Sequence, residues 1–181
     1  MQLEILKPLK FVVTGPESSG KTTLAQSLGG RFGWPVVPEY ARIYLEGKSM
    51  TSYNQHDFDR IVLGQFNAEQ RAEANAQQPL IFDTSALVLH IWHLEKWGGV
   101  HPLVQTKLKA VQNTFFLLCR PDIPWEYDPL REHPEDRDHL YGKYFKELKN
   151  WNFPFIEISG SPSHRLEEAT LQIKKWAKNI D

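Results

Sequence analysis

Residues Gly15-Pro16-Glu17-Ser18-Ser19-Gly20-Lys21-Thr22-Thr23 decide the fold of this 181-residue chain. Their spacing is Gly-x-x-x-x-Gly-Lys-Thr, the Walker A pattern. A strand-like apolar run, 10–14, precedes the stretch, and a helix-like run follows it. The glycines let successive backbone N–H groups turn toward one point, where they and the helix N-terminus hold phosphate oxygens. The stretch therefore predicts a phosphate-binding loop, or P-loop, that binds ATP through residues 15–23.

Three side chains complete the predicted phosphate site. Lys21 supplies positive charge to the β- and γ-phosphates, and the hydroxyl of Thr22 is a ligand for Mg2+. Asp83 ends a later apolar run, where a Walker B aspartate holds the metal. Asp83 could instead belong to the cap of the helix that follows, and the two roles are compatible. We expect Thr22 and Asp83 to bind Mg2+, and Lys21 and Asp83 to act in catalysis.

The order of apolar runs predicts the fold class. Strands are expected at residues 10–14, 35–38, 80–83, 114–119 and 154–159, and helices at 21–32, 55–77, 85–97, 103–112, from about 136, and from 161. Most strands lack alternation, which is typical of strands that helices cover on both faces. The sequence predicts an α/β three-layer sandwich with a parallel sheet of five strands, and one domain over residues 1–181.

Composition excludes several classes of protein. The formal net charge is −1, so no broad basic surface for nucleic acid is expected. No apolar stretch approaches the ~20 residues that span a bilayer, and the N-terminus lacks the apolar core of a signal peptide. The single cysteine excludes an intramolecular disulfide. We expect a cytoplasmic protein without a membrane or nucleic-acid partner.

The segment of residues 120–150 combines several prolines with dense mixed charge, then becomes helical. A long segment of this kind is either a solvated surface loop or a lid over a site. Two of its arginines, Arg131 and Arg137, are candidates for stabilising a transferring phosphoryl group. Either one could instead pair with a nearby carboxylate at the surface. We favour a helical lid.

Two absences favour transfer of the phosphoryl group over its hydrolysis. ATPase motors often carry a glutamate directly after the Walker B aspartate, but here Thr84 follows Asp83. The guanine-specifying Asn-Lys-x-Asp pattern is also absent, so a GTPase is not expected. We therefore expect an acceptor molecule to bind beside the ATP site.

The second strand ends close to Glu39 and Arg42. Ligands of open α/β sheets lie beyond the carboxyl ends of the strands, so Glu39 should face the P-loop across a crevice. A carboxylate there can accept the proton of an attacking hydroxyl, with Arg42 nearby. The alternative is a surface ion pair between Glu39 and Arg42.

The helix predicted at 55–77 carries Gln65 and Glu69 in the middle of its apolar face. Burying these groups without partners is costly, so they either bond inside the protein or face a ligand cavity. We favour the cavity. Together with Glu39 and Asp57, the aromatic residues Tyr40, Tyr53 and Trp125 would then suit an aromatic ring of positive charge.

The motifs form an ordered series that resembles a known family. Besides residues 15–23, they are Val37-Pro38-Glu39-Tyr40-Ala41-Arg42, Phe82-Asp83-Thr84, the stretch from Leu118 to Arg131, and Ile158-Ser159-Gly160-Ser161. The series resembles the ribosylnicotinamide kinase domain of bacterial NadR-type NAD biosynthesis proteins, from about residue 11 to 165. Its most specific part is Pro121-Asp122-Ile123-Pro124-Trp125.

The resemblance implies a nucleoside-kinase-like P-loop fold and an activity. MgATP would phosphorylate the 5′-hydroxyl of nicotinamide riboside, with Glu39 as base and Trp125 against the pyridinium ring. Only residues 1–14 precede the P-loop, so we expect neither the adenylyltransferase nor the DNA-binding domain of NadR proteins. Ser85 stands where the family often has a second aspartate, so the acceptor could differ. The alternatives are a kinase for another nucleoside or nucleotide, and a nucleotide-dependent switch without small-molecule turnover.

Overall fold

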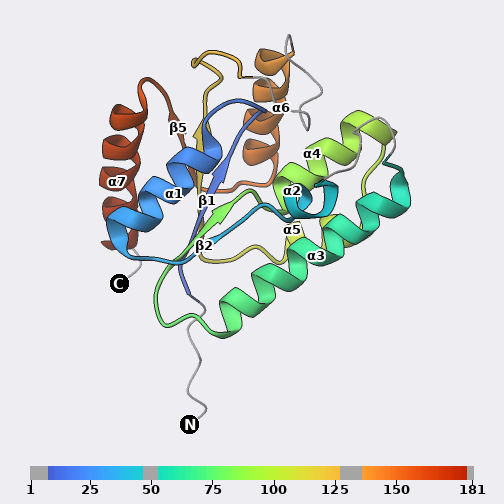
Figure 1. Ribbon diagram of the computed structural model, residues 1–181, viewed down its shortest axis with the longest axis horizontal. Coiled ribbons are helices and arrows are strands. Elements are labelled where there is room, and N and C mark those ends of the chain that lie inside the picture. The colour runs from blue at the N-terminus through green and yellow to red at the C-terminus, as the bar shows by residue number, and fades with distance from the viewer. Residues whose placement is uncertain (1–7, 47–52, 127–135, 179–181) are drawn as a thin grey trace.

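A parallel sheet of five strands forms the centre of the protein, in the order β2-β3-β1-β4-β5 (Figure 1). The computed structural model describes residues 8–46, 53–126 and 136–178. The strands are β1 (Lys10–Thr14), β2 (Val36–Val37), β3 (Leu80–Asp83), β4 (Thr114–Cys119) and β5 (Phe155–Ile158). The P-loop strand β1 is therefore central, and β3, which ends in Asp83, is its direct neighbour.

Helices cover both faces of the sheet, as the sequence predicts (Figure 1). On one face, α1 (Lys21–Phe32) packs against α7 (Pro162–Lys178). The other face carries α2 (Tyr40–Leu45), α3 (Gln55–Ala74), α4 (Ala86–Trp97), α5 (Pro102–Lys109) and α6 (Arg137–Asn150). The predicted three-layer α/β fold is confirmed. Within residues 8–46, 53–126 and 136–178, no helix has the length and apolarity needed to cross a membrane.

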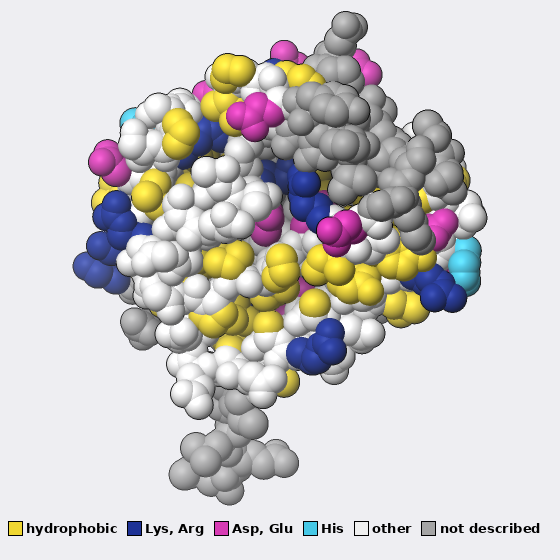
Figure 2. Space-filling view, viewed as in Figure 1, with side chains coloured by type: hydrophobic (Ala, Val, Ile, Leu, Met, Phe, Trp, Pro, Cys, Tyr) yellow, Lys and Arg dark blue, Asp and Glu magenta, His cyan; other side chains and the backbone are white. Residues whose placement is uncertain are grey.

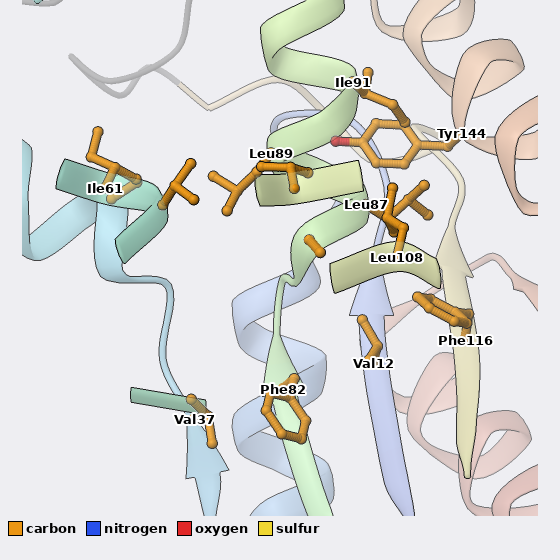
Figure 3. Packing of buried hydrophobic residues seen from close by; sticks show 14 of the residues in the cluster. Val12, Val37, Ile61, Phe82, Leu87, Leu89, Ile91, Leu108, Phe116 and Tyr144 are labelled. Carbon is orange, nitrogen blue, oxygen red and sulfur yellow. The ribbon is translucent and has the colours of Figure 1, made fainter. Parts of the chain in front are cut away.

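The protein has one hydrophobic core on each face of the sheet, and side chains along each strand point alternately into one and the other. Val12 pairs in register with Phe82 and Phe116, and these three side chains belong to the same core as Leu87 and Leu108 of the helices (Figure 3). Their neighbours along each strand point into the second core, beneath α1 and α7. This burial on both faces explains why β1, β3 and β4 are nearly continuous apolar runs.

Most predicted elements are found close to their expected bounds. The strands at 10–14, 80–83 and 114–119 and the helix at 21–32 begin and end at the predicted residues. The sequence analysis missed α2, because six residues are too few for a helical period to be visible. It also placed the end of α3 at 77, whereas the helix ends at Ala74.

Two adjacent glycines of α1 make a matched test of this packing. A Cβ on Gly29 would lie 2.4 Å from Cγ2 of Val36, whereas a Cβ on Gly30 would meet nothing within 4 Å. Both substitutions by alanine gain the same helix propensity, about 1 kcal/mol. We expect Gly30→Ala to stabilise the protein by up to that amount. Gly29→Ala should destabilise it by about 1–3 kcal/mol, because β2 must shift. Urea unfolding of both variants measures the difference, and equal stabilities would contradict the α1–β2 packing.

Candidate active site

A cavity of about 420 Å³ lies where the P-loop meets the helices of the opposite face. Figure 2 shows that this side of the molecule is hollowed near its middle, with both basic and acidic side chains at the border. Besides the P-loop residues from Gly15 to Thr23, the lining includes Glu39, Arg42, Leu45, Ile91, Trp92, Glu95, Ile123, Leu140, Tyr144 and Arg165. The cavity thus joins the predicted ATP site to Glu39 and Arg42 in a single space.

The P-loop is folded around its glycines. Gly15 and Gly20 both have positive φ angles, of 138° and 76°, which side chains with a Cβ rarely adopt. A Cβ on Gly15 would also lie 2.6 Å from the carbonyl oxygen of Cys119 on β4. Within the loop, Ser19 Oγ and Lys21 Nζ each donate a hydrogen bond of 2.7 Å to the carbonyl oxygen of Pro16. The loop therefore has the closed shape that a phosphate cradle requires.

Asp83 lies at the carboxyl end of β3 and is 3% exposed. Its Oδ1 atom is buried and has no hydrogen-bond partner among the described residues. An orphaned carboxylate oxygen in a polar site suits a metal ion, because a hard cation such as Mg2+ prefers oxygen ligands. Thr22 lines the cavity on the adjacent P-loop side. Asp83 and Thr22 thus fit the expected metal, which would neutralise phosphate charge when bound.

Asp83→Asn tests this metal role. An amide keeps the size of the side chain but loses the charge that attracts Mg2+. We expect the Mg2+ concentration for half-maximal activity to rise at least about tenfold, while the melting temperature changes little. Activity is measured across a Mg2+ titration, with Asp138→Asn, on the exposed start of α6, as the matched control. An unchanged Mg2+ response would leave Asp83 with only a structural role.

Glu39 lines the cavity, in the same space as the P-loop, and also forms the ion pair with Arg42. Arg42 Nε lies 3.3 Å from Glu39 Oε2, and both side chains belong to the cavity wall. Burial raises the pKa of Glu39, although the positive charge of Lys21 opposes the rise, and the charge of Asp83 adds to it. These interactions place Glu39, Lys21 and Asp83 in one electrostatic neighbourhood, which suits a proton acceptor beside a phosphate site.

Gln65 and Glu69 bond inside the protein, contrary to the prediction that they face a ligand. Gln65 Oε1 accepts a 2.8 Å hydrogen bond from the backbone N–H of Tyr40, and Gln65 Nε2 donates to Glu69 Oε1 at 3.2 Å. Glu69 Oε2 in turn lies 3.1 Å from Lys107 Nζ. This buried chain of polar groups provides a hydrogen-bond acceptor for the backbone N–H at the start of α2. It therefore helps to fix the position of Glu39, which directly precedes α2.

The other acidic candidate, Asp57, is also structural. It closes the capping box of α3 by accepting from the backbone N–H of Asn54, and it accepts a 2.8 Å bond from Tyr44 Oη. Neither oxygen is therefore directed at the cavity. The acidic residues of α3 are satisfied by the fold, so the prediction that they bind the acceptor is corrected.

The aromatic residues expected around a cationic ring lie elsewhere. Tyr40 packs its ring on Gly64 so closely that a Cβ there would lie 2.0 Å from Cε1. Tyr53 is 5% exposed, and Lys96 Nζ lies 3.3 Å from its ring centroid. Trp125 has the guanidinium of Arg137 5.8 Å from its ring. The protein's own cations thus lie against the rings of Tyr53 and Trp125, and none of the three aromatic residues lines the cavity.

The described part of the expected lid contacts the P-loop. Arg137, the first residue of α6, donates hydrogen bonds to the carbonyl oxygens of Ser18 at 3.2 Å and Ile123 at 2.9 Å. The backbone N–H of Glu126 donates to Ser18 Oγ at 3.0 Å. Arg131 lies outside the described residues, so its expected role stays a prediction.

Sequence reasoning missed several residues of the cavity wall. Trp92, Glu95 and Tyr144 come from α4 and α6, whose approach to the P-loop depends on packing between distant segments. Burial raises the pKa of the Tyr144 hydroxyl, and the nearby charge of Glu39 adds to the rise. The burial of Arg165 could have been predicted from the sequence, because Arg165 precedes the buried Ala169 by four positions on the apolar face of α7.

A sequence profile of the AAA domain family matches residues 10–165. The chain belongs to this family. A curated relative, the trifunctional NAD biosynthesis/regulator protein NadR of Salmonella typhimurium, is 28% identical over 152 residues, which are 81% of this chain and 37% of the relative. The predicted resemblance to NadR is confirmed, and the chain spans little more than a third of that relative's length.

Solved structures of similar shape support the kinase-like P-loop fold. A structure of NadR protein in complex with NR has a TM-score of 0.73 and 21% identity, and the match covers 91% of this chain and 49% of that one. A structure of deoxyadenosine kinase from M. mycoides has a TM-score of 0.64 and 13% identity, over 92% of this chain and 100% of that one. At these identities the likeness shows the fold alone.

Proposed function

We propose that this protein transfers the γ-phosphoryl group of ATP to a hydroxyl of a nucleoside, with nicotinamide riboside as the favoured acceptor and nicotinamide mononucleotide as the product. The observation that carries the proposal is a single cavity lined both by the P-loop, with Lys21, and by Glu39. A phosphate cradle and a proton acceptor in one enclosed space are the components that phosphoryl transfer to an alcohol requires.

The residues of the site have roles that follow from their positions. The P-loop N–H groups bind the phosphates of ATP, and Lys21 stabilises negative charge on the transferring group. Mg2+, held by Thr22 and Asp83, would neutralise further phosphate charge when bound. Glu39 accepts the proton of the acceptor hydroxyl, and its raised pKa makes it a stronger base than an ordinary carboxylate. Arg42 orients Glu39 through their ion pair.

The acceptor ring would rest on the wall formed by α2, α4 and α6. Leu45, Ile91, Trp92 and Leu140 give this wall an apolar surface, and the carboxylate of Glu95 at its border is paired with Lys143. The indole of Trp92 is held by a 2.6 Å hydrogen bond from its Nε1 to Tyr53 Oη. A fixed indole face attracts a cationic ring by roughly 0.5–2 kcal/mol. Trp92 thereby takes the role that the sequence analysis gave to Trp125, Tyr40 and Tyr53.

The relatives support nicotinamide riboside without excluding other nucleosides. One solved NadR structure holds NR, and the curated relative's name includes NAD biosynthesis. A deoxyadenosine kinase shares the fold, so a neutral nucleoside is the second candidate. The charge of the ring distinguishes the two, because only a pyridinium gains from the indole face of Trp92.

A panel of nucleosides tests the acceptor. Purified protein with MgATP is offered nicotinamide riboside, adenosine, deoxycytidine and uridine, and products are identified by mass spectrometry. We expect nicotinamide riboside to have the highest kcat/KM. Trp92→Ala should raise the KM for it about tenfold and leave the KM for ATP unchanged, whereas Trp34→Ala, on the α1 side, should change neither. Preferential phosphorylation of a neutral nucleoside would overturn the acceptor and retain the kinase.

A further inference from the structure

The guanidinium of Arg165 joins three loops at the carboxyl edge of the sheet. Arg165 is in the first turns of α7 and is 3% exposed. It donates hydrogen bonds to the carbonyl oxygens of Ser19 at 2.8 Å, Arg120 at 2.9 Å and Gly160 at 2.8 Å. These acceptors follow β1, β4 and β5 respectively. One planar side chain therefore sets the spacing of the P-loop relative to its two neighbouring loops.

Asp122 completes this contact from the opposite side. Its Oδ1 pairs with the guanidinium of Arg165, and its Oδ2 accepts a 2.6 Å hydrogen bond from the backbone N–H of Gly160. The next residue, Ile123, places Cδ1 within 3.2 Å of where a Cβ on Gly20 would lie. Arg165 and Asp122 thus hold the segment after β4 in contact with the P-loop.

The bond to Ser19 has a direct consequence for the phosphate cradle. The carbonyl of Ser19 and the N–H of Gly20 belong to one planar trans peptide, in which the two groups point in opposite directions. Arg165 draws the carbonyl toward α7, so the N–H of Gly20 must point away from it. Gly20 is also a residue of the cavity wall. The guanidinium therefore controls the direction of a donor in the cradle.

We propose that Arg165 is a positioning residue for the phosphate chain of the nucleotide, acting through the peptide between Ser19 and Gly20. The proposal rests on the proposed function only in that the P-loop binds a nucleoside triphosphate, and it is independent of the acceptor. A lysine at this position would keep the positive charge but could not donate to three carbonyls in one plane. The geometry of the guanidinium, more than its charge, is therefore the property to test.

The test compares the binding of MgATP with that of inorganic tripolyphosphate in the presence of Mg2+, for the wild type and for Arg165→Lys. Tripolyphosphate has the phosphate chain without the base or the sugar. We expect Kd to rise about tenfold for both ligands, by the same factor, and the KM for the acceptor to stay unchanged. Arg120→Lys is the matched control, because the Arg120 side chain is exposed and pairs with Glu157 instead of the P-loop. It should bind both ligands as the wild type does.

Two results with Arg165→Lys would overturn the inference alone. Unchanged binding of both ligands by folded Arg165→Lys would show that Arg165 only stabilises the fold, and a loss confined to MgATP would indicate a contact with the base or sugar. If Arg165→Lys does not fold, Asp122→Asn serves instead, since Asp122 is 37% exposed, and an equal loss of about threefold for both ligands is expected. A wild type that binds neither ligand would overturn the proposed function together with this inference.

Discussion

Lys21→Ala is expected to lower phosphoryl transfer by at least about a hundredfold while the protein stays folded. Removing one group that stabilises transition-state charge typically costs 10²–10³ in kcat. Lys21 is partly exposed in the cavity and donates a hydrogen bond within the P-loop, to the carbonyl oxygen of Pro16. It is the first residue of α1, where alanine is a good helix former. The loss should therefore appear in catalysis and not in the melting temperature.

Product formation and thermal melting are measured on the same preparation of Lys21→Ala. Lys109→Ala is the matched control, because Lys109 is exposed on α5 and does not line the cavity. The control should keep full activity. Normal turnover by Lys21→Ala would contradict phosphoryl transfer in the P-loop, whatever the acceptor.

Glu39→Gln is expected to lower kcat by about 10²–10⁴ and to raise stability at neutral pH. The first effect follows because an amide cannot accept the proton of the acceptor hydroxyl. The second follows because burial raises the pKa of Glu39, so that ionised Glu39 is less favourable in the folded protein than in the unfolded chain. The ionised carboxylate of Glu39 lowers the free energy of unfolding, and its replacement by an isosteric amide should restore that free energy.

The pH dependence of stability follows with a definite sign. A carboxyl group whose pKa is higher in the folded state binds its proton more tightly there. Its contribution to stability is full below the pKa of the unfolded state and is lost as the pH rises through the pKa of the folded state. The melting temperature of Glu39→Gln minus that of the wild type should therefore increase from acid to neutral pH.

Melting curves between acid and neutral pH, with initial rates, test both effects of Glu39→Gln. Glu46→Gln, an exposed residue at the end of α2, is the control and should match the wild type in each. An unchanged kcat for Glu39→Gln would contradict a role of Glu39 in catalysis. A difference in melting temperature that shrinks as the pH rises would contradict the burial of its charge.

Local patterns predicted the sheet and the P-loop because their signals lie within a few residues. Two local features could be recognised without knowledge of the rest of the chain. They are the glycines at the positive φ angles of Gly15 and Gly20, and the apolar runs that form the buried strands β1, β3 and β4. The resemblance to NadR extended this prediction to the fold. By contrast, α2 is shorter than two helical turns, so its pattern carried too little information.

The cavity wall was less predictable, because it depends on which distant segments meet. Gln65 and Glu69 were correctly recognised as polar groups on a buried face, but their partners are Tyr40 and Lys107, from other helices. Trp92 looked like any core residue of α4, because most residues of the preceding turns of this helix are apolar. A polar residue on an apolar face thus predicts a partner, and only the fold decides whether that partner is a ligand or the protein itself.

One labelling experiment distinguishes transfer of the phosphoryl group to an acceptor from its hydrolysis. The protein is mixed with ATP carrying an isotopic label in its γ-phosphoryl group, Mg2+ and nicotinamide riboside, and the label is followed into product. We expect the label to appear in nicotinamide mononucleotide, with little in inorganic phosphate, and ATP consumption to depend on the nucleoside. Label that appears only in inorganic phosphate, at a rate that no nucleoside changes, would contradict transfer to an acceptor.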